Sequence, residues 1–291
     1  MWQIRESTAK SIFTPTSGFL KEAGFTHSVT PARNCTYGCT YCYVPTMGMY
    51  GGLSPEDVLK WGHFTTLKTN AAELVARGGT GQQVIYCSPL VDPYQPAERE
   101  RPQMPELLSA FAKRPPRILV IQTRGPLILR DLELLQSLAS VTTLRISFSI
   151  TTDREEVRRH YEPRCESNET RLKVVRTLRS AGLEVYATLA PLLPCNPERL
   201  AEWALAASER DLIGDPLHVR EAKPRGATTR AMAFRIASRY GDEAWFQPDF
   251  QREVSARIHE TAAQAGFDFA TGPQGFSRLT RQPSGGKGTP Q

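Results

Sequence analysis

The sequence predicts an α/β protein folded as an open, partial (β/α)6 barrel of the TIM type, with an N-terminal extension and C-terminal helices. Three observations predict this class. Short apolar runs rich in β-branched residues alternate with segments of helical spacing, as in the βαβ crossovers that build a parallel sheet. The alternation gives about six such units, too few to close an eight-stranded barrel. The 291 residues suit a single barrel-sized domain.

Six strands make up the expected barrel, and each leads into a turn or a helical segment. They are expected at His27–Pro31, Gln83–Ser88, Arg117–Thr123, Leu144–Ile150, Leu183–Leu189 and Pro216–Glu221. A further strand-like run, His63–Leu67, lies between the first two. The run Leu144–Ile150 alternates strictly, which is the period of a strand.

Helical segments lie between these strands, and some of their ends carry clear signals. Ser54 followed by Pro55 indicates an N-cap with proline at the first helical position, and Asn70–Glu73 begins a helix that stops at two glycines. Other helices are expected at Pro105–Lys113, Leu127–Leu138, Leu172–Ala181 and Pro197–Ser208. The chain divides accordingly into an extension (1–25), a barrel core (26–224), a region of two helices (225–270) and a disordered tail (271–291).

Composition and charge are those of a globular protein that can bury a full core. Hydrophobic residues make up 40% of the chain and charged residues 23%, and no apolar run approaches the ~18 residues that span a bilayer. Because no apolar leader occupies residues 1–20, we expect a reducing cytoplasm and no membrane partner. The net charge of +6 permits a nucleic-acid or phosphate partner, although arginines on solvated helix faces explain it as well.

Three cysteines within eight residues are the strongest chemical signal in the chain. Cys35, Cys39 and Cys42 are separated by three and then two residues, and thiolates are the ligands that iron–sulfur clusters take. Three protein ligands leave one iron open, where a small molecule can coordinate. Two alternatives stay open here: a disulfide with a spare thiol, and a structural zinc site that would need a fourth ligand. The other cysteines are scattered, at Cys87, Cys165 and Cys195.

Polar segments follow the predicted strands at the points where a barrel places its active site. The segment Cys87–Glu98 follows one strand and Thr123–Asp131 follows the next, while Ser149 lies near the end of a third. Because the carboxyl ends of parallel strands open at one mouth, we expect these segments to face the cysteine loop.

These segments and the cysteines together resemble the radical S-adenosylmethionine (SAM) superfamily, in its spore photoproduct lyase-like branch. The resemblance rests on Tyr41 before the last cysteine, on Asp92-Pro93-Tyr94-Gln95-Pro96, and on Thr123-Arg124 followed by Arg130-Asp131. It covers roughly residues 26–194. It implies a [4Fe–4S] cluster held by the three cysteines, with the amine and carboxylate of SAM on the fourth iron.

The resemblance also implies roles for single residues around SAM. Tyr41 would lie along SAM beside the cluster, Ser88 and Asp92 would line its amine and ribose, and Arg124 would meet its carboxylate. Ser147 and Ser149 share one face of their strand, which should point into the barrel, although ordinary strand serines would show the same pattern.

The reaction implied is electron transfer from the reduced cluster into SAM, giving a 5′-deoxyadenosyl radical that abstracts hydrogen from a substrate. The electron would come from an external donor such as flavodoxin or ferredoxin. In spore photoproduct lyase a cysteine on the second barrel strand returns hydrogen to the product, and Cys87 falls at a similar place; a buried small residue is the alternative. Tyr43 is a candidate radical relay or a packed aromatic, and we interpret Cys165 and Cys195 as structural.

Three interpretations of function follow from these residues. The first is a lyase-like radical SAM enzyme that acts on a nucleic acid, either DNA or RNA. The second is the same chemistry on a peptide or a small molecule. The third is a metal- or cluster-binding protein without turnover. Formation of 5′-deoxyadenosine separates the first two from the third.

Overall fold

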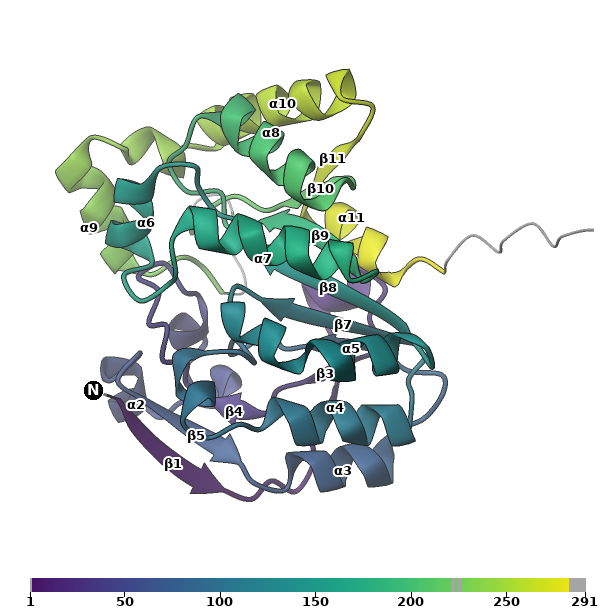
Figure 1. The fold of residues 1–291 in the computed structure, drawn as a ribbon. Coiled ribbons are helices and arrows are strands. Elements are labelled where there is room, and N and C mark those ends of the chain that lie inside the picture. Colours follow the sequence, from purple (N-terminus) through teal and green to yellow (C-terminus); the bar gives the residue numbers. More distant parts are fainter. Residues whose placement is uncertain (1, 221–222, 224–226, 283–291) are drawn as a thin grey trace, which may run out of the picture.

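The main feature of the fold is an open sheet of eight strands, in the order β11-β10-β9-β8-β7-β6-β3-β2 (Figure 1). The computed structural model describes residues 2–220, 223 and 227–282. All strands except β2 run parallel to their neighbours, and within the described residues the two outer strands do not pair with each other. The predicted open barrel is therefore confirmed. The strands span Phe13–Pro15 (β2), His27–Val29 (β3), Val84–Cys87 (β6), Ile118–Thr123 (β7), Thr143–Ser149 (β8), Glu184–Leu189 (β9), Leu212–Gly214 (β10) and Phe269–Thr271 (β11).

Helices cover one face of this sheet, because each carries an apolar stripe that packs on the strands. Leu107 and Phe111 are buried on one of these helices, and Val175 and Leu178 on another. Each helix carries the chain back so that the next strand runs parallel, as predicted from the alternation. The covering helices are Ala71–Gly78 (α3), Met104–Lys113 (α4), Leu132–Ala139 (α5), Asn168–Ser180 (α7) and Pro197–Ser208 (α8) (Figure 1).

Side chains along each strand alternate between the helix-covered face and the concave interior of the partial barrel. Ile121 and Phe148 belong to the large core that includes the helices, whereas Gln122 and Ser149, one position further along, hydrogen bond to each other on the opposite face. At the amino ends of the strands this interior holds a buried apolar cluster beside the Arg145–Glu184 ion pair (2.9 Å), and at the carboxyl ends it becomes polar. The polar end is where a barrel of this type carries its chemistry.

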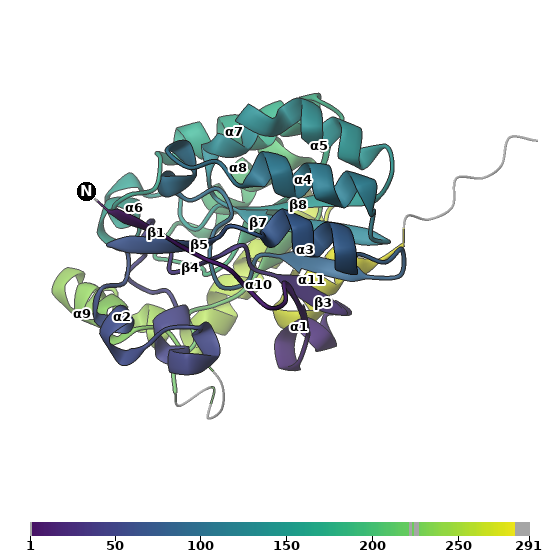
Figure 2. The same cartoon turned by 90° about the horizontal axis from the view of Figure 1, so that it is seen from below.

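The amino ends of the strands are closed by segments from both ends of the chain. Phe276 and Leu279 join Phe25, Val84 and Ile118 in a separate buried cluster. Phe276 belongs to Gly272–Phe276 (α11), and Leu279 belongs to Ser277–Thr280 (η5). Helix α11 lies beside Gly18–Glu22 (α1) (Figure 2).

The disordered tail predicted for 271–291 is therefore wrong over its first part, since 272–280 are helical and packed. Its apolar residues are too few to show a period in the sequence, but the open base of the barrel buries them. Residues 283–291 lie outside the described residues.

A second, three-stranded sheet stands beside the barrel and carries the entry to the cysteine loop. It consists of Gln3–Ser7 (β1), Phe64–Lys68 (β5) and Ala32–Arg33 (β4), with β1 parallel and β4 antiparallel to β5. The strand predicted at 63–67 is thus present, but outside the barrel. The N-terminal extension contributes a strand to each sheet.

The last predicted strand is wrong in position. We expected it at Pro216–Glu221, whereas the structure has β10 at Leu212–Gly214, and residues 216–220 form no strand. Pro216 has no backbone N–H to donate to a ladder, which explains why pairing stops before it. Glu221 lies outside the described residues.

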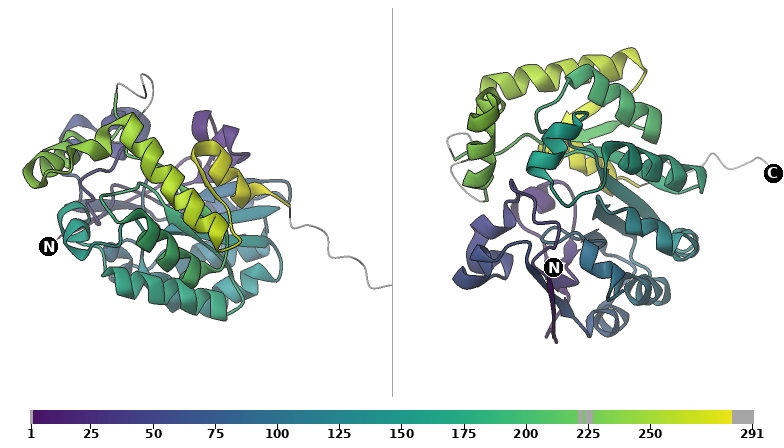
Figure 3. Two further views of the ribbon diagram at one scale, coloured as in Figure 1. Left: turned by 90° about the horizontal axis from the view of Figure 1, so that it is seen from above. Right: turned by 60° about the vertical axis from the view of Figure 1, so that its left-hand side comes forward.

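The remaining helices lie around the carboxyl ends and the outer edge of the sheet. Two long helices, Ala231–Tyr240 (α9) and Pro248–Gln264 (α10), confirm the predicted helical region, and α10 packs along α8 (Figure 3). Helix α9 contacts α6, near the cysteine loop. The shorter elements are Val44–Gly51 (η1), Pro55–Leu59 (α2), Pro96–Arg99 (η2), Pro126–Asp131 (η3), Glu155–Tyr161 (α6) and Glu243–Phe246 (η4).

Candidate cluster and cofactor site

The cysteine loop follows β4 and is folded tightly by two residues in the left-handed region. Asn34 has φ 60° and Gly38 has φ 62°. The Asn34 side chain accepts hydrogen bonds from the backbone of Cys35 (2.8 Å) and of Gly62 (3.1 Å). A Cβ on Gly38 would lie 3.1 Å from the Gly62 Cα, so the loop can pack against Gly62 only with glycine at this position.

The three loop cysteines are free thiols that suit an iron–sulfur cluster. Cys35 and Cys39 are buried and Cys42 is half-buried, and turns join Cys35 to Gly38 and Cys39 to Cys42 through backbone hydrogen bonds of 3.1 and 3.3 Å. Burial raises the pKa of Cys42 to about 12. The pKa of Cys39 is lowered, chiefly by the thiol of Cys165. Sulfur donors with so little access to water fit a cluster better than a hydrated cation.

Another group of ligand-type atoms lies beside the loop. The Cys39 sulfur, a Glu162 carboxylate oxygen and the Cys165 sulfur are all within 4.8 Å of one another. Two guanidiniums already bind this carboxylate, so a cation there would face positive charge. This group of atoms therefore suits a metal ion less well than the cysteine triplet does.

A turn at residues 161–165, which we call the 161–165 turn, holds the cysteine loop from the other side. The Tyr161 carbonyl accepts hydrogen bonds from the backbone N–H (3.0 Å) and hydroxyl (3.1 Å) of Thr40. Arg164 Nη1 donates to the carbonyls of Thr36 (3.1 Å) and Gly62. Residues more than 100 positions apart in the chain thus fix both arms of the loop.

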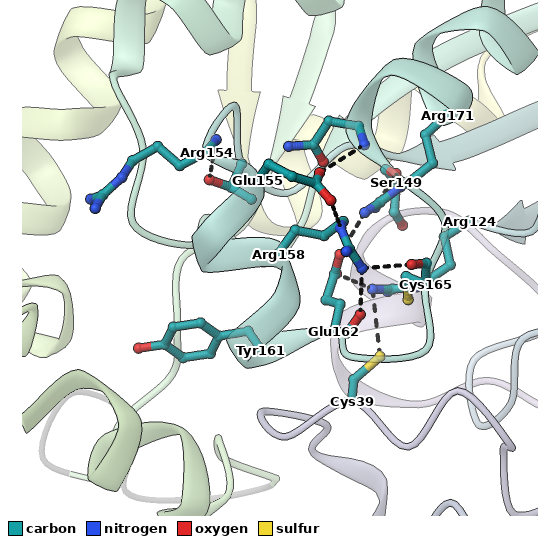
Figure 4. Close-up of polar contacts among 12 residues, drawn as sticks. Cys39, Arg124, Ser149, Arg154, Glu155, Arg158, Tyr161, Glu162, Cys165 and Arg171 are labelled. Carbon is teal, nitrogen blue, oxygen red and sulfur yellow. Dashed lines mark hydrogen bonds and ion pairs between the residues drawn. The ribbon is translucent and has the colours of Figure 1, made fainter. Parts of the chain in front are cut away.

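Glu162 is the centre of a buried ionic network beside the loop (Figure 4). Its Oε1 accepts hydrogen bonds from the Tyr41 hydroxyl and Arg124 Nη1, and its Oε2 accepts one from Arg171 Nη1, each at 2.5 Å. Arg171 also donates to the Ser149 carbonyl from Nε (3.2 Å) and Nη2 (2.6 Å). Burial acts to raise the pKa of Glu162, but Arg171 and Arg124 outweigh it and hold the pKa at about 2.

This network was not predicted, although its members are ordinary charged residues in the sequence. Glu162 and Arg171 are fully buried, and Cys165, which we expected to be structural, lies against Cys39. The available signal was the position of Glu162, which comes shortly after the carboxyl end of β8. Sequence spacing does not show that the chain turns back there toward a loop near residue 40.

Arg124 lies beside Cys39 and Tyr41 of the cysteine loop. Its Nη1 is 3.8 Å from the Cys39 sulfur, and it also donates to the Tyr41 hydroxyl. Asp92 holds it in place: Oδ2 accepts from the Arg124 backbone N–H (2.8 Å), and Oδ1 accepts from the Thr123 hydroxyl (2.6 Å). Asp92 therefore orients the turn after β7 through contacts within the chain, and burial raises its pKa.

The serines predicted around SAM lie at the carboxyl ends of the strands. Ser147 and Ser149 share the interior face, as expected, where Ser147 Oγ is 2.5 Å from Thr188 Oγ1 and Ser149 Oγ accepts a hydrogen bond from Gln122 (2.8 Å). Ser88 is buried after β6, with its hydroxyl 3.4 Å from that of Thr30. Ser147 and Ser149 thus lie on β8, whereas Ser88 follows β6, and β7 lies between these two strands.

Cys87 points away from this interior. Its register partners on the adjacent strands are Val29 and Ile121, which are fully buried core residues, and Cys87 is fully buried with them. Its neighbour Tyr86 has the opposite orientation and donates to Gln122 (2.8 Å). This placement favours the alternative for Cys87, a small apolar residue of the core.

Tyr43 lies at the mouth, just beyond the third cysteine. Tyr43 is 41% exposed, and its hydroxyl donates to the Pro89 carbonyl (2.5 Å). Partial burial raises its pKa above that of an ordinary tyrosine. Tyr43 thus connects the cysteine loop to the segment after β6.

No helix within the described ranges is both long and apolar enough to cross a membrane.

The fold and the site together define an α/β partial barrel with a three-cysteine loop at the carboxyl ends of its strands. Residues 29–205 match the family model described as the radical SAM superfamily. The chain belongs to this superfamily, as the resemblance indicated.

Comparisons with individual proteins agree with this assignment. An uncharacterised protein of Methanocaldococcus jannaschii is 28% identical over 192 residues, which cover 66% of this chain and 68% of that protein. An uncharacterised protein of Mycobacterium tuberculosis is 26% identical over 174 residues, covering 58% of this chain and 50% of that protein. The match thus spans about half the length of the mycobacterial relative.

Among solved structures, a mutant of spore photoproduct lyase aligns with a TM-score of 0.61 over 92% of this chain and 82% of that chain, at 13% identity. Spore photoproduct lyase complexed with dinucleoside spore photoproduct aligns with a TM-score of 0.59 over the same shares, at 14% identity. At this identity the likeness shows a shared fold.

Proposed function

We propose that this protein is a radical SAM enzyme that holds a [4Fe–4S] cluster on Cys35, Cys39 and Cys42 and acts on a nucleic acid. When bound, a reduced cluster and SAM supply a one-electron cleavage that yields a 5′-deoxyadenosyl radical, which abstracts hydrogen from a substrate. The electron would come from an external donor such as flavodoxin or ferredoxin. The observation that carries the proposal is the contact of Arg124 with Cys39 and Tyr41 of the three-cysteine loop at the mouth of the barrel.

The chain's own residues position and enclose the reactants. Within the described part of the chain the Arg124 side chain makes its contacts through Nη1 and Nε, which leaves Nη2 to bind the carboxylate of SAM. Glu162 fixes this guanidinium and the Tyr41 hydroxyl, so the loop keeps one shape before ligands arrive. Ser147 and Ser149 offer hydroxyls to the interior at the same end.

A nucleic-acid substrate is supported by the surface of α9. Met232, Phe234 and Tyr240 are exposed on this helix, the Tyr240 ring stacks on His160 with centroids 4.0 Å apart, and Arg239 lies over the Tyr240 ring. The chain just before α9 donates a backbone hydrogen bond to the Tyr41 carbonyl (3.4 Å), so the N-terminal end of α9 adjoins the cysteine loop. Stacking rings beside arginines suit single-stranded nucleic acid.

The catalytic proposal is tested by anaerobic reconstitution with iron and sulfide, followed by dithionite and SAM. We expect four irons per chain, cluster absorbance and formation of 5′-deoxyadenosine. Cys39→Ala should abolish the absorbance and the product, whereas Cys195→Ala should retain both. Wild-type protein that binds a cluster but forms no 5′-deoxyadenosine would contradict the proposal that the protein is a radical SAM enzyme.

The substrate class is tested by fluorescence anisotropy with single-stranded DNA and RNA at 50 and 200 mM salt. We expect affinity to fall steeply with salt, and Tyr240→Ala to weaken binding by about tenfold, since stacking contributes ~1–3 kcal/mol per base. Arg252→Ala, on the exposed face of α10, is the matched surface control. Binding that is absent, or equal in both variants, would favour a peptide or small-molecule substrate.

A further inference from the structure

The Cys39 sulfur differs from the other two proposed cluster ligands in its surroundings. Its neighbours are side chains, with Arg124 Nη1 at 3.8 Å and the Cys165 sulfur within 4.8 Å (Figure 4). Within the described residues, no side chain hydrogen bonds to the sulfur of Cys35 or Cys42. Cys39 is therefore the proposed ligand at which substitution of a neighbouring side chain can change the contacts of the sulfur.

Cys165 is held rigidly in front of Cys39 by the 161–165 turn. The Cys165 backbone N–H donates to the Glu162 carbonyl (3.0 Å), and Arg158 Nη1 donates to the carbonyls of Glu162 (3.1 Å) and Cys165 (2.6 Å). Arg158 is itself buried and bound to Glu155 at 2.7 Å. These three contacts fix the backbone of the turn and so keep Cys165 beside the cysteine loop.

We infer that Cys165 donates a hydrogen bond to the ligand sulfur of Cys39 and thereby raises the reduction potential of the cluster. The inference rests on the proposed function. As a ligand Cys39 is a thiolate, which only accepts, whereas Cys165 keeps its S–H and donates. Hydrogen bonds to ligand sulfurs are among the factors that set cluster potentials, because they stabilise the added negative charge of the reduced state.

Burial strengthens this effect. Cys39 is 7% exposed and Cys165 6% exposed, so little water competes for the sulfur, and a hydrogen bond there is stronger than at the surface. Arg124 donates to the same sulfur and adds a positive charge. Cys165 is then a positioning residue that acts through Cys39 and makes the cluster easier for a one-electron donor to reduce.

The test is a redox titration of the reconstituted holoenzyme, followed by electron paramagnetic resonance. Three variants are compared with wild type: Cys165→Ala removes the donor, Cys165→Ser replaces it with a hydroxyl, and Cys195→Ala removes a thiol remote from the loop. At a fixed ambient potential we expect Cys165→Ala to lower the ratio of reduced to oxidised cluster by about three- to tenfold, from a net hydrogen-bond contribution of ~0.5–1.5 kcal/mol. Cys165→Ser should stay at or above wild type, and Cys195→Ala should match it.

Several outcomes would overturn the inference. A reduction potential of Cys165→Ala equal to that of wild type would do so. A reduction potential of Cys165→Ser below that of wild type would also do so, and this variant gives the result if Cys165→Ala binds too little cluster to titrate. Loss of one iron in Cys165→Ala, with the signal of a three-iron cluster, would make Cys165 a ligand instead. If wild-type protein loads no cluster at all, the proposed function fails; a normal wild type with unmoved variants removes only this inference.

Discussion

Replacing Glu162 by glutamine tests the buried network most directly, because it removes a charge and keeps the shape. The pKa of Glu162 is about 2 in the folded protein, against 4.5 for an ordinary glutamate. At about 1.4 kcal/mol per pH unit, the ionised carboxylate contributes ~3 kcal/mol to the free energy of unfolding at pH 7. Both Glu162 and Arg171 are fully buried, so solvent does not screen this contribution. Glu162→Gln should therefore lower the free energy of unfolding at pH 7 by about this amount.

The dependence on pH gives the second half of this prediction. Because the folded-state pKa is depressed, the contribution is fully present above about pH 4.5 and is lost as the pH falls through about 2. The difference in the free energy of unfolding between wild type and Glu162→Gln should shrink to ~2 kcal/mol at pH 3.5. Urea unfolding of the reduced, cluster-free chain at several pH values measures it.

A matched control separates the network from carboxylates in general. Glu198 forms an exposed pair with Arg257 at 2.7 Å, and Glu198→Gln should change stability by less than about 1 kcal/mol. The reasoning is refuted if Glu162→Gln is as stable as wild type at pH 7, or if its deficit does not change between pH 7 and pH 3.5.

Three further variants test other parts of the site. Arg124→Gln should weaken SAM binding to the reconstituted protein by about 10- to 100-fold in equilibrium dialysis, since a charged hydrogen bond contributes ~1.5–3 kcal/mol; unchanged affinity would remove Arg124 from the SAM site. Cys87→Ala should leave 5′-deoxyadenosine formation within about twofold and cost ~1 kcal/mol of stability in urea unfolding for a small cavity, whereas a variant as stable as wild type would contradict the core position of Cys87. Arg158→Ala should lower the free energy of unfolding by ~2–4 kcal/mol and release iron faster to a chelator, because two buried carbonyls and the partly exposed Glu155 carboxylate lose their donor. Iron release at the wild-type rate would show that the 161–165 turn does not support the loop.

The parts of the fold that could be predicted are those with a local pattern. Strand β8 alternates over seven residues, and α8 begins with proline behind an Asn196 cap and runs to Ser208 as expected. The cysteine triplet is likewise a local signal. In contrast, β10 and β11 have three residues each, too short for any period, and they form because a neighbouring strand pairs with them.

The candidate site shows the same limit more sharply. Tyr41 and Arg124 could be predicted because each belongs to a short motif. Glu162 and Cys165 could not, because their contacts with the loop join residues about 120 positions apart, and such contacts depend on how the crossover after β8 turns. The orientation of Cys87 was also unpredictable, since a shift of one residue along β6 would reverse the face it occupies.

The closure of the barrel base by residues 269–280 has a consequence for how the protein is made. Phe19 packs on Phe276, and Thr280 hydrogen bonds to the Ala23 carbonyl, so the first helix finds its partners more than 250 residues later in synthesis. Strands β3 to β9 can pair on the ribosome, but their apolar amino ends stay uncovered until α11 emerges. The apolar side chains at the base of the barrel are therefore exposed to chaperones during most of translation. We expect the docking of residues 269–280 to be the final folding step.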